Sequence, residues 1–75
     1  MKLLDTMKLL DTVALLENIP DLSLYRGQVG TIVEVCEPDS FEVEFVDIQG
    51  HTYALETLNS QQLILLHHQP LLATA

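Results

Sequence analysis

The chain has 75 residues, of which 48% are hydrophobic, and eleven acidic residues against three basic ones give it a formal net charge of −8. A chain of this length forms one small domain, which buries roughly 60% of the surface that its unfolded form exposes. The negative charge disfavours direct binding to nucleic-acid phosphates or to an anionic membrane, and it favours a basic partner. A single cysteine allows no intramolecular disulfide, and aspartates interrupt the N-terminal apolar stretch, so we expect a cytoplasmic protein without a signal peptide.

The hexapeptide MKLLDT occurs twice in succession, as Met1–Thr6 and Met7–Thr12. A repeat this short is not the unit of a repeat architecture. Residues 1–8 are therefore predicted to be a flexible, duplicated leader. The alternative is a short amphipathic helix with Leu3, Met7 and Leu10 on one face, which the poor helix formers Asp and Thr disfavour. The ordered domain is expected over residues 9–67, and residues 68–75 are expected to be a disordered tail.

Residues Leu9–Leu16 are predicted to form the first strand, with Val13 and Leu15 on the same face. Apolar residues at helical spacing in this stretch leave a helix as the alternative. The following connector, Glu17–Tyr25, is too apolar for a free loop. Four of its residues are therefore expected to cover one end of the fold: Ile19, Leu22, Leu24 and Tyr25.

The centre of the chain, Arg26–Gly50, is predicted to be an antiparallel hairpin. Its first strand, residues 31–36, is rich in β-branched side chains, and a Pro-Asp-Ser turn follows. Its second strand, residues 41–46, alternates strictly. That alternation places three apolar residues on a core face and two acids on a solvent face: Phe41, Val43 and Phe45 against Glu42 and Glu44.

Two further strands are predicted after the hairpin, at residues 51–56 and 61–66. A single helical turn at residues 57–60 is expected to separate them, with Leu58 as its buried side chain. The resulting order predicts an all-β fold, a small five-stranded SH3-like barrel with one short helical turn before the last strand. Curling such a sheet into a barrel removes most of its exposed edges.

Four segments carry a resemblance to a known family: DTVALLENIP at 11–20, RGQVGTIVEV at 26–35, EVEFVD at 42–47 and TYALETL at 52–58. Together they resemble a family of short bacterial proteins, common in cyanobacteria, that is catalogued as a domain of unknown function. The resemblance covers about residues 9–66 and implies a small SH3-like barrel without an assigned activity. The hairpin is also similar to the core of KOW modules, but those that bind RNA or ribosomes are usually basic.

No arrangement of residues in the sequence points to catalysis or to a metal. Cys36 lies between Val35 and Glu37, whereas a reactive thiolate needs a nearby cation or helix N-terminus, which favours an inert cysteine over a nucleophile. The histidines, His51, His67 and His68, do not form a pair at zinc spacing and are interpreted as surface residues. We therefore expect no enzyme activity, no metal and no cofactor.

The candidate partner-binding residues form two groups. Glu34, Glu42 and Glu44 are predicted to form an acidic face, for which the alternative is an ordinary solvated sheet surface. The hairpin holds six of the eleven acids: Glu34, Glu37, Asp39, Glu42, Glu44 and Asp47. The second group lies where SH3-like barrels often place groove residues, although its members could simply cover the end of the barrel: Tyr25, Arg26 and Tyr53.

These observations favour a non-catalytic protein-interaction module. In its specific form it would be the small acidic, antitoxin-like partner of a basic or toxin-like protein. The first alternative is a structural or assembly protein, a homo-oligomer that associates through the apolar edge Leu63–Leu66. The second is a KOW-like nucleic-acid-binding barrel, which the negative charge disfavours.

Overall fold

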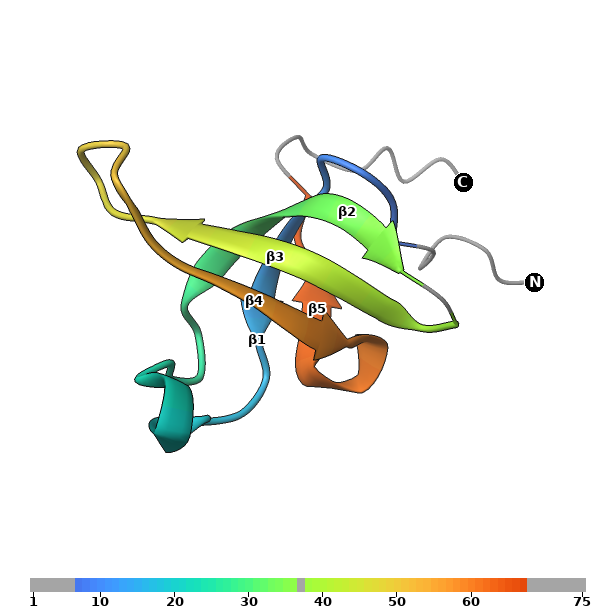
Figure 1. Ribbon diagram of the computed structural model, residues 1–75, viewed down its shortest axis with the longest axis horizontal. Helices are drawn as coiled ribbons and strands as arrows, with labels where there is room; N and C mark the ends of the chain where they lie inside the picture. The colour runs from blue at the N-terminus through green and yellow to red at the C-terminus, as the bar shows by residue number, and fades with distance from the viewer. Residues whose placement is uncertain (1–6, 37, 68–75) are drawn as a thin grey trace, which may run out of the picture.

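The computed structural model describes residues 7–36 and 38–67. Within them lie five strands and two 3-10 turns, and Figure 1 shows their arrangement. The strands are β1 (Thr12–Leu15), β2 (Val29–Cys36), β3 (Ser40–Val46), β4 (Thr52–Asn59) and β5 (Leu63–Leu65), and the turns are η2 (Pro20–Leu22) and η3 (Ser60–Gln62). Most of the predicted leader, the whole predicted tail, Glu37 and His68 lie outside the described residues.

All neighbouring strands are antiparallel, and they form one sheet in the order β4-β3-β2-β1-β5. In Figure 1, β1 and β5 run across the direction of β3 and β4, so the sheet curls over itself instead of lying flat. This arrangement confirms the predicted all-β class and its small, five-stranded, barrel-like form. The helix considered for the first element is excluded, because residues 12–15 are a strand that pairs with both β2 and β5.

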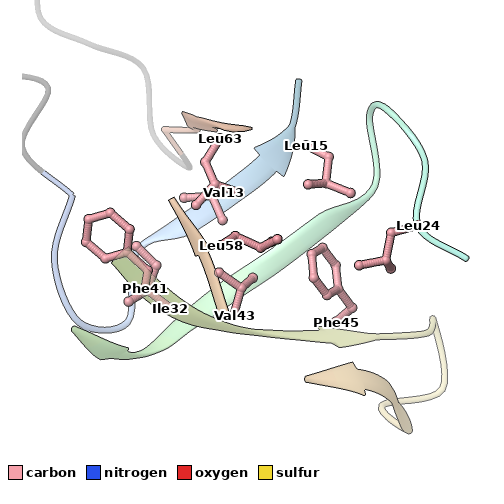
Figure 2. Packing of buried hydrophobic residues seen from close by; sticks show 9 residues of the cluster. All are labelled: Val13, Leu15, Leu24, Ile32, Phe41, Val43, Phe45, Leu58 and Leu63. Carbon is pink, nitrogen blue, oxygen red and sulfur yellow. The ribbon is translucent and has the colours of Figure 1, made fainter. Parts of the chain in front are cut away.

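The core lies inside this curl and draws on every strand. Figure 2 shows its nine buried members: Val13, Leu15, Leu24, Ile32, Phe41, Val43, Phe45, Leu58 and Leu63. The predicted core face of the hairpin is confirmed, since Phe41, Val43 and Phe45 are all buried. Val13 and Leu15 also share the core side as predicted. Aliphatic side chains and the two phenylalanines thus supply the apolar burial that stabilises the domain.

The first strand is shorter than predicted, because a turn occupies residues 8–11. The Asp11 N–H donates to the Lys8 carbonyl over 3.0 Å, and the Lys8 N–H donates to the Asp11 carboxylate over 2.9 Å. Leu10 adopts a φ of 72° in this turn, a conformation that a leucine seldom takes. The turn closed by Asp11 therefore delays the start of the extended stretch, and β1 begins only at Thr12.

The predicted helical turn at residues 57–60 is wrong in position, because β4 continues to Asn59. Asn59 then caps the turn η3: its side chain accepts from the Gln61 N–H, and its own N–H donates to the Gln62 side chain. This reciprocal cap fixes the turn three residues later than predicted. Leu58 is buried as predicted, but it belongs to a strand. The last strand is correspondingly limited to Leu63–Leu65.

The connector between β1 and β2 covers one end of the fold only in part. Leu24 is completely buried, and Ile19 packs against the core. The backbones of these two residues pair, with the Ile19 N–H donating to the Leu24 carbonyl over 2.7 Å. Leu22 and Tyr25 were expected to join them but are exposed. The turn η2 explains the exposure of Leu22, because this residue belongs to the turn and the turn lies outside the Ile19–Leu24 pair, whereas Tyr25 lies beyond that pair.

The turn between β3 and β4 is organised by one aspartate. The Asp47 carboxylate accepts from the N–H groups of Gln49, over 2.9 Å, and His51, over 3.0 Å. Gly50 takes a φ of 87°, which glycine adopts without strain. Ile48 is fully exposed at the tip. In Figure 1 this hairpin end extends beyond the rest of the sheet.

Candidate functional site

The three predicted glutamates lie on one face of the sheet, across β2 and β3. Glu34 is directly opposite Glu42, and Glu44 is opposite Thr31. Residues that pair across antiparallel strands point to the same side, so Glu34 and Glu42 share a face. Because Glu42 and Glu44 alternate with the buried residues of β3, that face is the one turned away from the core. We call these three residues the acidic face.

A β-bulge in β2 is what brings Glu34 to this face. The pairing between β2 and β3 shifts between Ile32 and Glu34, so Val33 is an extra residue on β2. In a regular strand, Glu34 would lie two residues beyond the buried Ile32 and would therefore point toward the core. The bulge reverses this and aligns Glu34 with Glu42. The sequence suggested that these carboxylates meet but contained no sign of the bulge.

The acidic face holds like charges, and no ion pair among the described residues brings a cation to it. Two carboxylates directly opposite each other across a pair of strands repel and destabilise the sheet. Over the part of the chain that the structure describes, the ion pairs join Lys8 to Asp11 and His51 to Asp47, at 3.3 and 3.8 Å, and neither involves the acidic face. Glu44 accepts a hydrogen bond from the Thr52 hydroxyl. The face is therefore uncompensated in charge.

The second predicted group is partly assembled, through a residue that the sequence analysis did not single out. Gln28 accepts from the Tyr25 N–H and donates to the Tyr53 hydroxyl over 3.1 Å. The Tyr53 ring also lies against the buried Phe45, with 6.2 Å between ring centroids. Both tyrosines are about half exposed. Gln28 follows Gly27 in a turn, and only the register of the folded sheet reveals that it bridges two aromatic residues.

Arg26 does not join this aromatic cluster by any contact that the structure shows. Its backbone N–H donates to the Asn18 side chain over 2.9 Å, and this bond joins the two ends of the connector between β1 and β2. Tyr53 packs on Phe45, whose side chain faces the core, whereas Glu44 next to it on β3 faces outward. The six predicted residues thus separate into the acidic face, the tyrosine pair and an isolated arginine.

The remaining described side chains include one thiol and line one apolar recess. The described residues contain no group of three or more His, Cys, Asp or Glu side chains that could hold a metal ion. Cys36 is a free, partly exposed thiol at the end of β2, opposite Ser40. A shallow apolar recess of about 350 Å³ lies beside β5 and is lined by Met7 and the strand's three residues.

The fold and the acidic face define a small all-β, barrel-like domain whose most distinctive exterior is a set of neighbouring carboxylates on β2 and β3. Comparison with protein families identifies it further: residues 9–65 match the model of a domain of unknown function, DUF4926. The chain belongs to that family. No curated protein and no solved structure was found to match it. None of the helical segments described in residues 7–36 and 38–67 is long and apolar enough to cross a membrane.

Proposed function

We propose that this chain is a non-catalytic protein-interaction module that binds a basic protein through its acidic face. The observation that supports the proposal best is the position of Glu34 directly opposite Glu42. Such a like-charge pair destabilises the isolated domain, and similar pairs differ from neutral ones by roughly 0.2–1 kcal/mol. A neutral polar pair would keep the surface equally wet without this cost.

A basic partner turns the same repulsion into binding energy. Lysine or arginine side chains placed between the carboxylates relieve the repulsion and form charge-assisted hydrogen bonds. Complementary charge also accelerates association and makes it sensitive to salt. The strongly acidic chain, with its net charge of −8, adds a long-range attraction for any cationic surface.

The more specific proposal is that the partner is a toxin-like protein or one that acts on nucleic acid, and that this chain shields the basic surface of that partner. A surface that binds phosphates is recognised by the same complementary charge, so the acidic face and a nucleic acid would compete for it. This antitoxin-like role predicts that the partner loses nucleic-acid binding when the acidic chain is bound.

The test compares two charge reversals of equal size. Glu42→Lys changes the acidic face, whereas Asp21→Lys changes an exposed acid in η2, away from that face. Each replaces one negative by one positive charge and so moves the formal net charge by two, from −8 to −6. Tagged wild-type and variant proteins are used for affinity capture from the source cell's lysate, and captured proteins are identified by mass spectrometry.

A basic protein retained by the wild type and by Asp21→Lys, but lost with Glu42→Lys and at high salt, supports the proposal. Equal retention by both variants would reject the acidic face as the binding surface. Thermal unfolding of each variant serves as the control that the domain remains folded. Titration of the identified partner with a short DNA or RNA, with and without this chain, then tests the shielding role.

A further inference from the structure

The two edges of the sheet differ in how they are protected. The order β4-β3-β2-β1-β5 leaves β4 and β5 as the edge strands. In β4, Glu56 pairs with the buried Val43 and so turns a charge to the core side of the edge, a device that discourages pairing with another chain. The strand β5, Leu63–Leu65, carries no charge, proline or other polar side chain. Of the two edges that the described strands form, only the β5 edge therefore lacks this protection.

The backbone of β5 offers hydrogen-bonding groups on its outer side. The Leu66 N–H donates to the Thr12 carbonyl, and the Leu16 N–H donates to the Gln62 carbonyl, each over 2.9 Å. Backbone hydrogen bonding alternates along an antiparallel strand. Since the bonds at positions 62 and 66 are to β1, the N–H and C=O of Ile64 also face β1. The N–H and C=O of Leu65 and the C=O of Leu63 consequently point away from β1.

Within the described part of the chain, one group on this outer side is satisfied locally. The Leu63 N–H donates to the Ser60 carbonyl of η3. What remains is the Leu65 N–H together with two carbonyls. A short stretch of backbone with unmet hydrogen-bonding groups is a template for adding another strand.

The side chains around this edge are apolar on both faces of the sheet. On the core side lie Leu63 and Leu65, and the recess of about 350 Å³ beside the strand is lined by Met7 and by all three residues of β5. On the outer side, Ile64 pairs with Ala14, which pairs in turn with Val29. Ile64 and Val29 are each nearly half exposed. An added strand would therefore bury apolar surface as well as satisfy the backbone.

We propose that β5 pairs antiparallel with β5 of a second copy of this chain, about a two-fold axis at Leu65. In this register the two Leu65 residues exchange both of their backbone hydrogen bonds. The Leu63 carbonyl of each copy then faces the N–H of residue 67 of the other. On the outer side, Ile64 of one copy lies opposite Leu66 of its partner, an apolar cross-strand pair.

A second copy fits this edge better than an unrelated partner for two reasons. Antiparallel pairing about a two-fold axis is self-complementary, so one strand supplies both halves of the interface. The acidic face lies on β2 and β3, so copies that carry a net charge of −8 each meet at their uncharged edges. The proposal stands independently of the basic partner.

The competing occupant is the chain's own segment Met1–Thr6, which directly precedes Met7 in the recess. Its leucines could fill the recess from within one molecule. A variant that begins at Met7 separates the two ideas. It keeps the dimer of the wild type if a second copy occupies the edge, whereas if the leader does, the wild type is a monomer and the variant loses stability.

The decisive experiment is analytical ultracentrifugation over a wide concentration range, with Ile64→Lys and Leu55→Lys as matched variants. Leu55 is also half exposed, but it lies on the other edge strand, β4. We expect the wild type and Leu55→Lys to show a mass near twice 8.4 kDa. Ile64→Lys should raise the dissociation constant about tenfold or more, because each copy now brings a charge to the apolar pair.

A wild type that stays at 8.4 kDa at every concentration overturns the proposal. A dimer that survives Ile64→Lys, or that Leu55→Lys weakens equally, overturns the assignment to β5. Hydrogen exchange of the unmodified chain supplies a readout that needs no variant. The Leu65 amide should become more protected as concentration rises, and unchanged exchange in a concentration-dependent dimer would also reject the β5 register.

Discussion

Gly30 is the position where the structure makes the sharpest prediction about stability. This residue lies in β2, opposite Phe45, and is buried. A Cβ added there would lie 2.6 Å from Val43 Cγ1 and 2.9 Å from the Glu44 carbonyl oxygen. The first contact involves a packed core side chain, and the second involves backbone that is held in a strand. Neither neighbour moves away freely, so Gly30→Ala forces the β2–β3 pair apart.

The magnitude follows from two opposing effects. Inserting a methyl into a packed core typically costs about 1–3 kcal/mol. Replacing glycine within a strand returns roughly 0.5–1 kcal/mol, because alanine loses less backbone entropy on folding. The central values of these two effects differ by about 1.3 kcal/mol, and since the close contacts involve a core side chain and strand backbone, we expect the free energy of unfolding to fall by about 1–2 kcal/mol. For a domain of this size, that corresponds to a decrease of about 4–15 °C in the midpoint of thermal unfolding.

Urea and thermal unfolding, followed by circular dichroism, measure the effect. Combining Gly30→Ala with Val43→Ala provides an internal check, because the second change removes the Cγ1 atom that the new Cβ meets. The two changes should then cost less together than the sum of their separate costs. A Gly30→Ala variant as stable as the wild type, or more stable, would refute the close approach of β2 and β3.

Two further predictions concern the acidic face and the turn before β5. Glu42→Gln should raise the free energy of unfolding by roughly 0.2–1 kcal/mol at low salt, since it ends the repulsion with Glu34. The gain should shrink in high salt, and a loss of stability at low salt in urea unfolding would contradict the like-charge pairing. Asn59→Ala should lower stability by about 0.5–2 kcal/mol by removing the cap of η3. The matched control is Asn18→Ala, which removes the Asn18 side chain's hydrogen bond from the Arg26 N–H instead of a cap. An unchanged midpoint of thermal unfolding in Asn59→Ala would show that the cap is not needed.

The part of the core that β3 supplies could be predicted from the sequence because alternation determines it. Phe41, Val43 and Phe45 recur at every second position between two turn signals, and no competing period fits them. The ends of the elements could not be predicted as well, because side-chain caps set them. Asp11 closes the turn before β1, and Asn59 caps the turn η3. In each case a side-chain oxygen accepts a hydrogen bond from a backbone N–H.

The candidate site was predictable as a list of residues but not as an arrangement. Glu42 and Glu44 follow from the alternation of β3. The third member, Glu34, reaches the face only through the extra residue Val33, which the β-branched sequence of β2 does not mark. Gln28, which accepts from the Tyr25 N–H three residues away, reaches Tyr53 across 25 positions of sequence, and no local pattern indicates such a contact. Long-range register, rather than composition, determines which polar side chains meet.

The turn at the tip of the β3–β4 hairpin makes a practical attachment point. Its backbone is held by the carboxylate of Asp47, so the identity of the side chain at position 48 contributes nothing to the fold around it. Ile48 can therefore be replaced by a cysteine that carries a fluorophore or spin label, provided that Cys36 is first replaced by serine. A label at that projecting tip would report binding of a partner or self-association without changing β5 or the acidic face.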